Sequence, residues 1–319
     1  MIAAALLLLL PFPQESADWF PTHSLSVHRV SSDRTLTGDE LLKIGETHDF
    51  QQHFQETLTY YELALSAFRE KKQAKGVATT LVKIAQVRER QGKFQDADVA
   101  LREALPILAR SSDRLAHARA LLVAGRISTR LGYWEDARAS LGQAVKFFDR
   151  AKDHRGWNDA LVHLGLLQVG DGQSEPGLSA LQQAWQDART RQDRTQQLSA
   201  VVALGTAAWL LDRTTNARRY YEDGLHLAQQ ERDMALEATL RLRLAHIYSE
   251  DGRLNDAIDS GKRALIVSRT LRDSATEAAV LSRLGDVYRK TGQTAEADES
   301  DQRALLLYSH RQTLVHGGR

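Results

Sequence analysis

The sequence repeats itself at an interval of 40 residues, and this periodicity limits the chain to a small set of folds. The stretches "QGKFQDA" at 91–97, "LGYWEDA" at 131–137 and "DGRLNDA" at 251–257 share a glycine, a bulky residue two places later and an alanine five places later. When the chain is written in rows of 40, positions one above another form columns, and similar residues recur in each column without an insertion. Repeats of this length are supersecondary units that bury their apolar faces against their neighbours. The sequence therefore predicts a solenoid.

Each row predicts two helices joined by a turn. In the third row, Leu121, Ala124, Gly125 and Ser128 lie at i, i+3, i+4 and i+7, which is one stripe of a helix. Gly132 follows, and glycine readily takes the left-handed conformation that ends many helices. The stripe of the second helix is formed by Ala137, Leu141, Ala144, Val145 and Phe148. Small residues in these stripes allow two helix backbones to approach closely, and large residues fill the space beside them.

Polar residues mark the start of each first helix. The stretch Thr37–Glu40 has the pattern of a capping box, so the array is expected to begin near residue 37. Later rows carry an aspartate in one column, suited to cap the following helix: Asp113, Asp153, Asp193, Asp233 and Asp273. The predicted repeats are about 37–73, 74–113, 114–153, 154–193, 194–233, 234–273 and 274–311.

These columns resemble the tetratricopeptide repeat (TPR), which has small residues at fixed positions of both helices and a glycine between them. The resemblance covers residues 37–311. The unit here is longer than the common form of 34 residues, and the expected proline near its end is absent. Both departures are similar to the longer variant seen in kinesin light chain and in many bacterial signalling proteins. The resemblance implies an all-α, right-handed α-solenoid of about seven helix-turn-helix repeats that serves as a binding scaffold.

The segments outside the array bear on localisation. Residues 1–16 are a candidate signal peptide, because the apolar run Ile2–Leu10 has the length of a signal-peptide core and is too short to span a bilayer. No Lys or Arg precedes this run, and Glu15-Ser16-Ala17 is the nearest approach to a cleavage site. The protein is expected to be periplasmic or secreted if the run is a signal-peptide core, and otherwise cytoplasmic. A mis-assigned start or a fragment of a longer chain is the alternative. Residues 17–36 predict a linker and 312–319 a tail.

Composition and motifs favour a non-enzymatic protein without cofactors. The 42 Lys and Arg residues nearly cancel the 41 Asp and Glu residues, which argues against a nucleic-acid partner. Cysteine is absent, so disulfides, cysteine-ligated zinc and thiol nucleophiles are excluded. The stretch "GDGQSEPG" at 170–177 lacks the ending of a phosphate-binding loop and the spacing of a nucleophile elbow, and is interpreted as a turn between helices. No pattern predicts a metal site or a catalytic triad.

The predicted binding site is the concave face, which the first helices line if the family's architecture holds. That face is expected to have an apolar floor with basic residues toward both ends, and so to bind an apolar segment with acidic flanks. The predicted partner-binding residues are Arg119, Leu122, Arg126, Arg130, Val162, Leu166, Val169, Val202, Thr206, Trp209, Leu242, His246, Arg283 and Arg289. The alternative is that superhelical twist buries Val162, Leu166, Val202 and Trp209 between adjacent rows.

Two functions remain open at this point. The first is an adaptor that binds a peptide or protein segment in its groove. The second is a regulatory or sensor array of a bacterial signalling system whose effector, such as a caspase-like protease or a transcription regulator, is absent from this chain. A hydrolase is a distant third. The Lys, Asn and Arg set by which some TPR modules grip chaperone tails has no counterpart, since Val82, Gln86 and Val123 hold equivalent positions.

The last row predicts the end of the array and a weak self-association. Asp301 occupies a column that holds Tyr or Leu in most earlier rows, and a further repeat would bury this charge without an evident partner. Leu306, Leu307 and Tyr308 follow, and no covering helix is predicted after them. The C-terminal repeat is therefore expected to associate weakly with another copy.

Overall fold

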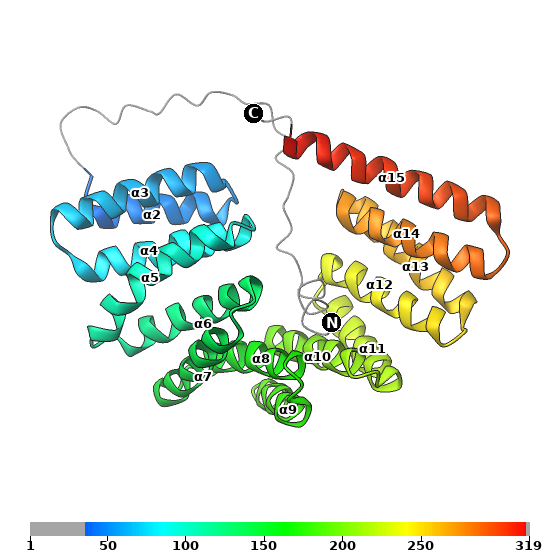
Figure 1. The fold of residues 1–319 in the computed structure, drawn as a ribbon, viewed down its shortest axis with the longest axis horizontal. Coiled ribbons are helices and arrows are strands. Elements are labelled where there is room, and N and C mark those ends of the chain that lie inside the picture. Colours follow the sequence, from blue (N-terminus) through cyan, green and yellow to red (C-terminus); the bar gives the residue numbers. More distant parts are fainter. Residues whose placement is uncertain (1–35, 317–319) are drawn as a thin grey trace. The chain divides into compact units, whose positions relative to one another are not determined.

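A computed structural model describes residues 36–316, and within this range the chain forms fourteen α-helices and no strands (Figure 1). This confirms the predicted all-α solenoid of paired helices. From α4 onward, the first helices of successive pairs begin 40 residues apart, at 74, 114, 154, 194, 234 and 274. None of the helices in the described residues combines the length and the apolar character needed to cross a membrane. The predicted signal peptide and residues 17–35 of the predicted linker lie outside the described residues.

The described helices divide between two compact units, Met1–Ala180 and Leu181–Arg319. The first unit contains α2 (Gly38–Phe50), α3 (Phe54–Glu70), α4 (Ala74–Arg90), α5 (Phe94–Arg110), α6 (Arg114–Leu131), α7 (Trp134–Ala151) and α8 (His154–Gly170). The boundary falls within α9 (Ser174–Thr190). The second unit contains α10 (Arg194–Leu210), α11 (Thr214–Gln230), α12 (Met234–Glu250), α13 (Leu254–Thr270), α14 (Ser274–Lys290) and α15 (Thr294–His316). Even-numbered helices are the first helices of their pairs, and odd-numbered helices are the second.

The predicted caps are present at the starts of the first helices. Thr37 and Glu40 form the capping box, in which the Glu40 carboxylate accepts hydrogen bonds from the Thr37 backbone N–H (2.8 Å) and hydroxyl (2.9 Å). The aspartate that precedes each of the five later helices accepts a hydrogen bond from the backbone N–H three residues on, as Asp113 does from Ala116 (3.0 Å). These bonds satisfy amide groups that a helix leaves without partners at its start.

Left-handed residues end most of the helices. Gly132 has φ of 78°, and Gly92, Gly172, Gly252 and Gly292 are also left-handed. Gln52 and Asp212, which replace glycine in this column, take the same conformation. Left-handed residues without a glycine signal also end second helices, at Lys72, Lys152, Gln192, Arg232 and Arg272. Both kinds of turn therefore use a left-handed residue to reverse the chain. Glycine, which adopts this conformation with the least strain, occurs only in the column that follows the first helices.

Small residues on the first helices receive large side chains of the second helices. A Cβ placed on Gly125 would lie 2.5 Å from Leu141 Cγ, and one on Gly45 would lie 2.5 Å from the Tyr61 ring. The same arrangement recurs in the second unit, where Gly205 lies against Tyr221. This interlocking explains why the columns alternate small and large residues at fixed spacing.

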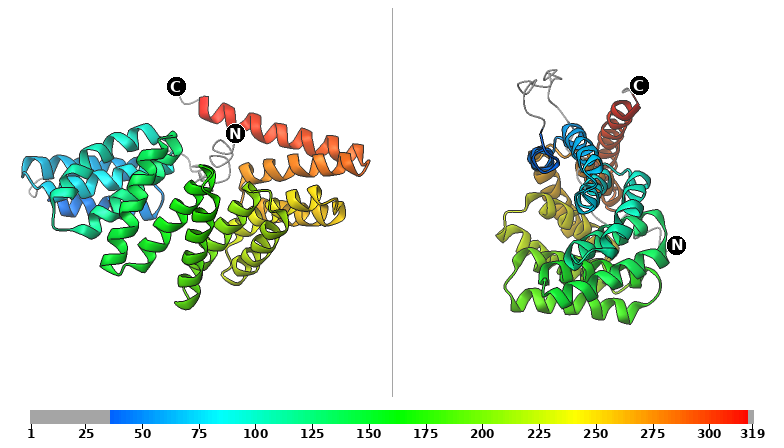
Figure 2. Two further views of the ribbon diagram at one scale, coloured as in Figure 1. Left: turned by 60° about the horizontal axis from the view of Figure 1, so that its bottom comes forward. Right: turned by 90° about the vertical axis from the view of Figure 1, so that its left-hand side faces the viewer.

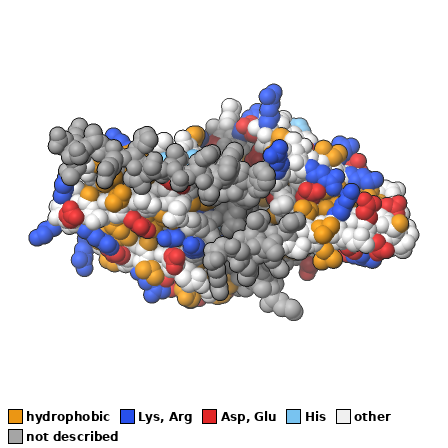
Figure 3. All heavy atoms as spheres, turned by 90° about the horizontal axis from the view of Figure 1, so that it is seen from above, with side chains coloured by type: hydrophobic (Ala, Val, Ile, Leu, Met, Phe, Trp, Pro, Cys, Tyr) orange, Lys and Arg blue, Asp and Glu red, His pale blue; other side chains and the backbone are white. Residues whose placement is uncertain are grey.

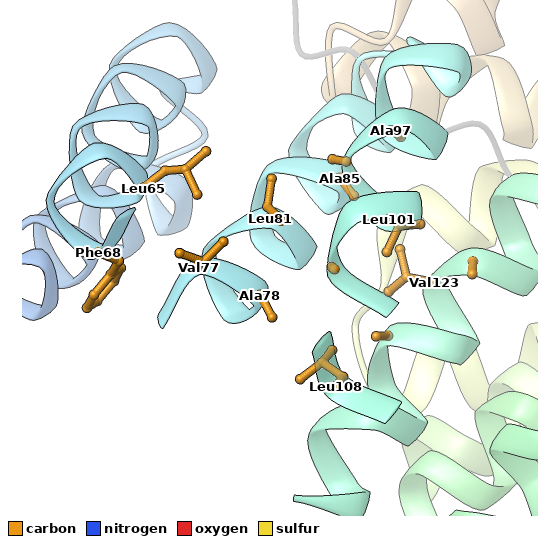
Figure 4. Packing of buried hydrophobic residues seen from close by; sticks show 14 of the residues in the cluster. Leu65, Phe68, Val77, Ala78, Leu81, Ala85, Ala97, Leu101, Leu108 and Val123 are labelled. Atoms are coloured by element: carbon orange, nitrogen blue, oxygen red, sulfur yellow. The ribbon is translucent and has the colours of Figure 1, made fainter. Parts of the chain in front are cut away.

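Apolar clusters lie between successive helix pairs in each unit. In the first unit, Phe68 and Leu65 of α3 face Val77 and Leu81 of α4, and the cluster continues to Val123 of α6 (Figure 4). In the second unit, the helix pairs from α12 to α15 stack in sequence order (Figure 2). Helices therefore contact their neighbours in the chain, as expected of a solenoid.

The first helices form the inner layer of each unit. Neighbouring first helices contact one another in the pairs α2–α4, α4–α6, α6–α8 and α12–α14. Such contacts are not made between the successive second helices α3 and α5, α5 and α7, α11 and α13, or α13 and α15. First helices therefore lie closer together than second helices, so the face they line is the inner one.

Candidate functional site

The inner face of the second unit brings an aromatic residue, a histidine and two cations together from three first helices. Trp209 of α10 lies edge-on to His246 of α12, with 5.8 Å between the ring centroids. Trp209 is half-buried against the apolar interior, as is Leu242 of α12. Both keep part of their surface exposed. We call Trp209, Leu242, His246, Arg283 and Lys290 the α10–α14 surface.

Two cations of α14 lie beside His246. Lys290 Nζ donates hydrogen bonds to Ser249 Oγ (2.9 Å) and to the Ser249 carbonyl oxygen (3.4 Å), and no carboxylate of the described chain forms an ion pair with it. The Arg283 side chain is 35% exposed, with Asp286 at 3.5 Å. Arg283 and Lys290 thus carry positive charge that the neighbouring side chains neutralise only in part.

His246 is a neutral group in this surrounding. Burial, together with the positive charges of Arg283 and Lys290, lowers the pKa of His246 below its ordinary value, although Glu250 acts in the opposite direction. Its Nε2 lies 3.3 Å from a Glu250 carboxylate oxygen, and its buried Nδ1 has no hydrogen-bond partner. At neutral pH the positive charge of the α10–α14 surface therefore comes from α14.

The predicted apolar floor is largely buried. Five of the predicted partner-binding residues are less than 9% exposed: Leu122, Val162, Leu166, Val169 and Thr206. Val169 packs on Gly177, whose Cβ would lie 2.7 Å from a Val169 methyl group, and Thr206 accepts a hydrogen bond from the Tyr221 hydroxyl (3.3 Å). The expectation that these residues are exposed is therefore corrected. First helices are covered on several sides, by second helices and by each other, so their buried stripe is wider than a single apolar face.

The predicted arginines of the first unit are engaged by its own side chains. Arg126 of α6 makes a two-pronged contact with Glu89 of α4, with 2.9 Å between Nε and Oε1. Ion pairs also join α4 to α2, where Lys83 lies 2.9 Å from Glu46 and Arg90 pairs with Asp49. Carboxylates of the preceding helix thus neutralise much of the positive charge expected on this face.

The remaining predicted residues differ in their surroundings. Arg130 is half-buried with its guanidinium 5.8 Å from the centre of the Phe94 ring, and burial lowers its pKa. Arg119 is exposed, 3.8 Å from an Asp153 oxygen. Arg289 pairs with Asp286 (2.8 Å) and with Asp301. Val202 is half-buried beside Trp209 in one cluster. Of the predicted set, Trp209, His246 and Arg283 therefore come together, and Leu242 lies one helical turn before His246 on α12.

The sequence pattern did not point to two residues of this surface, Lys290 and Ser249. Lys290 stands in the same column as Arg130, four rows later, and Ser249 stands in the column of Trp209, one row later. The repeat columns could therefore have indicated both positions. The contact between α12 and α14 that brings the two residues together could not be read from the repeat.

The described residues hold no metal site, and the one face shown in Figure 3 has no large field of one charge. No group of three His, Cys, Asp or Glu residues in the described part could hold a metal ion. On the face shown in Figure 3, basic and acidic side chains are interspersed over the described residues.

Comparison with known proteins agrees with this architecture. Residues 236–309 match the family model described as tetratricopeptide repeat. No curated protein matches the sequence. The fold is similar to that of aspartyl phosphate phosphatase F from Bacillus subtilis, with a TM-score of 0.64 and 12% identity over 85% of this chain and 70% of that one.

Two further solved structures share the fold. One is the Rap conjugation gene regulator of the plasmid pLS20 in complex with the Phr* peptide, with a TM-score of 0.61 and 17% identity over 93% of this chain and 83% of that one. The other is a signal transduction ATPase with numerous domains (STAND) from Pyrococcus horikoshii that has a tetratricopeptide repeat sensor, with a TM-score of 0.64 and 15% identity over 83% of this chain and 40% of that one. The longer-repeat variant stays a prediction. With its stacked helix pairs, its small-to-large packing columns and a tetratricopeptide repeat model that matches residues 236–309, the described chain is a helical solenoid of the tetratricopeptide-repeat type.

Proposed function

We propose that this protein is a non-enzymatic scaffold that binds a peptide or protein segment on the α10–α14 surface. The observation that carries the proposal is the contact of Trp209 with His246 beside two incompletely neutralised cations. Half-buried aromatic residues and arginines are favoured anchors of protein interfaces. Support also comes from the pLS20 Rap regulator, which shares the fold and was solved in complex with a peptide.

The partner segment is expected to carry an apolar residue flanked by acidic ones. The apolar residue would contact Trp209 and Leu242, and an acidic group would approach Lys290 and Arg283. The acidic requirement follows from charge, because a carboxylate near two cations gains Coulomb energy that a neutral residue lacks. The apolar contact supplies most of the affinity, whereas exposed charges mainly affect association rate and salt dependence.

Selection from a library of random displayed peptides tests this proposal directly. Peptides recovered on the wild-type chain should be enriched in an apolar residue with neighbouring Asp or Glu. Trp209→Ala should weaken their binding by about 2 kcal/mol, or roughly 30-fold. Lys290→Gln should weaken it less, and its effect should shrink at high salt because screening acts on exposed charges.

Matched controls separate binding from folding. Trp157→Ala removes another half-buried tryptophan, in the first unit, and Lys262→Gln removes an exposed lysine of α13. Both should leave peptide affinity unchanged. If Trp209→Ala lowers the melting temperature while affinity stays the same, Trp209 is a packing residue and the surface lies elsewhere. Failure to recover any peptide would contradict the scaffold function itself.

A sensor array of a bacterial signalling system is the second candidate function. The observation that favours it is the fold likeness to the STAND protein, whose repeats are described as a sensor. An effector domain encoded in the same reading frame would support this function. The likeness to aspartyl phosphate phosphatase F is one of fold alone, at 12% identity. Because we propose a non-enzymatic protein, the purified chain should not dephosphorylate phosphorylated proteins.

Export remains part of the proposal. If Ile2–Leu10 is a signal-peptide core, the mature chain should begin close to Ala17. Mass determination of the protein purified from its native cell checks this, and an intact N-terminus would favour a cytoplasmic protein.

A further inference from the structure

Positive side chains gather at the turns that join second helices to the following first helices in the first unit. The stretches around these three turns, 69–76, 109–116 and 149–156, hold nine Lys or Arg residues and four Asp or Glu residues. The stretches around the four turns within helix pairs, 49–56, 89–96, 129–136 and 169–176, hold eight Asp or Glu residues and three Lys or Arg residues. Because the two helices of a pair run in opposite directions, the two sets of turns lie at opposite edges. We define the basic edge by exposed cations of the first set: Lys71, Lys72, Lys75, Arg110, Arg114 and Arg150.

Ion pairs show that the three turns of the basic edge lie side by side. Lys75 Nζ of α4 lies 2.8 Å from a carboxylate oxygen of Asp113, the residue that caps α6. Arg119 of α6 reaches Asp153, the residue that caps α8, at 3.8 Å. The cations therefore form one row along the unit and not three isolated groups.

Much of this positive charge has no carboxylate partner. Among the described residues, no ion pair is formed by four exposed cations of the edge: Lys71, Lys72, Arg110 and Arg150. Arg114 donates a hydrogen bond to a backbone carbonyl oxygen (3.3 Å), which leaves its charge in place. The basic edge thus offers positive charge to a ligand.

Helix stability does not account for all of these cations. The helix dipole favours those at the ends of α5 and α7, but Lys75 and Arg114 lie in the first turns of α4 and α6, where a positive charge opposes it. Lys72 and Lys152 take the left-handed conformation, with φ of 54° and 56°, which is disfavoured for residues with a Cβ. Cations thus occur where local structure favours an acid or a glycine, which indicates a role for the charge outside the fold.

The basic edge already binds a carboxylate of its own chain. The Asp113 carboxylate accepts a hydrogen bond from the Ala116 backbone N–H (3.0 Å) and lies 2.8 Å from Lys75 Nζ. Hydrogen bonds from Lys75 and from this N–H hold the pKa of Asp113 below its ordinary value. The cations without an ion pair can give the same stabilisation to a carboxylate from outside.

The surroundings of the cations favour a protein segment over a membrane or a nucleic acid. None of the large hydrophobic side chains exposed in the described chain lies in the three turns, so none there could insert into lipid. The turns also contain no Phe, Tyr or Trp on which a base could stack. The acidic turns at the opposite edge would repel a polyanion that wraps around the unit.

We propose that the basic edge binds an acidic segment of a partner protein in extended conformation. Packed helices are spaced by roughly 10 Å, and an extended chain advances about 3.4 Å per residue. About seven residues therefore reach across the three turns, with a carboxylate opposite each. The charges of adjacent turns act together at low ionic strength, because the screening length is about 10 Å at 0.1 M salt. The basic edge shares no residue with the α10–α14 surface, and the two proposals stand independently.

Fluorescence anisotropy of a labelled peptide of eight glutamates, titrated with the full chain, tests the proposal. The peptide should bind at low salt and be released as the salt concentration rises. Combining Lys71→Gln, Lys72→Gln and Arg110→Gln should raise the dissociation constant by about tenfold or more, as the sum of several exposed ion pairs. The variant should stay folded, since all three residues are exposed and Gln192 holds the position of Lys72 in a later repeat with the same left-handed backbone.

A matched triple variant controls for net charge. Combining Lys93→Gln, Lys146→Gln and Lys262→Gln removes three exposed lysines outside the basic edge and should leave the affinity for the glutamate peptide unchanged. Circular dichroism should show both triple variants folded.

Carbodiimide cross-linking places the peptide on the chain, because it joins a lysine Nζ to a glutamate carboxyl group as an amide. The cross-links should concentrate on Lys71, Lys72 and Lys75, and Lys93 should give few. Absence of binding, equal weakening in the two triple variants, or cross-links spread over all exposed lysines would overturn the proposal. Tighter binding of single-stranded DNA or of phosphatidylserine vesicles through the same residues would also overturn it, since the edge would then recognise phosphate and not an acidic protein segment.

Discussion

Backbone conformation at single residues decides how each helix pair is closed. Gly132 has φ of 78°, and no atom lies within 4 Å of the position that a Cβ would take. Glycine is therefore favoured there by the backbone conformation and not by packing, and Gln52 and Asp212 show that other residues can take the same conformation in this column. Gly142, in the middle of α7, also has open space around its Cβ position, but it does not have a positive φ. A substitution at Gly132 therefore reports on backbone strain, whereas a substitution at Gly142 reports on helix propensity.

The pair predicts opposite effects of one substitution. Gly132→Ala should destabilise the protein by about 1 kcal/mol, because an L-residue is disfavoured in the left-handed region. Gly142→Ala should stabilise it by about 0.5–1 kcal/mol, because alanine is the better helix former. Urea unfolding of both variants checks this. Changes of the same sign would contradict the assignment of these two backbone states.

At the scale of elements, the first helices of the N-terminal unit are joined by charged groups as well as by apolar packing. Arg126 and Arg130 of α6 face the half-buried His163 of α8, while Glu89 of α4 binds Arg126. Burial, with the two guanidinium charges, lowers the pKa of His163 to about 3. The imidazole is thus held neutral between α6 and α8.

This arrangement predicts a loss of stability in acid. In the unfolded chain histidine binds a proton below about pH 6.5, whereas folded His163 stays neutral down to about pH 3. The unfolded state therefore binds more protons in this window, and stability falls as pH decreases from 6.5 toward 3, by at most about 1.4 kcal/mol per pH unit. His163→Gln should remove this part of the pH dependence in chemical unfolding. The exposed His226→Gln is the control, and equal pH profiles of wild type and His163→Gln would contradict the prediction.

At the scale of the whole molecule, each helix pair is stabilised only by its neighbours. Within the first unit, each helix contacts its nearest helices in the chain, and each first helix also contacts the next first helix. Stability in such an array is a sum of local terms, so damage to one repeat stays local.

Hydrogen exchange should reveal this locality. Gly45→Val forces a side chain into the Tyr61 ring, where a Cβ would already lie 2.5 Å away. Overpacking of this kind typically costs about 1–3 kcal/mol. Amide protons of α2 and α3 should then exchange faster, while those of α6 and α7 keep their protection. Faster exchange in all four helices would mean that the first unit unfolds as one cooperative body.

The sequence by itself determined the helix pairs, their starts and ends, and the interlocking columns. These features depend on local chemistry: an aspartate such as Asp113 caps the residues next to it, and Gly125 and Leu141 meet because they lie 16 residues apart in one helix pair. The tertiary structure alone decided which inner-face residues remain accessible. Val162 and Leu166 are buried, Glu89 pairs with Arg126, and Lys290 binds Ser249 of α12 close to His246, which contacts Trp209. The physical reason is that accessibility depends on how far each helix is rotated against its neighbours from other repeats, and periodicity along the chain does not specify that rotation.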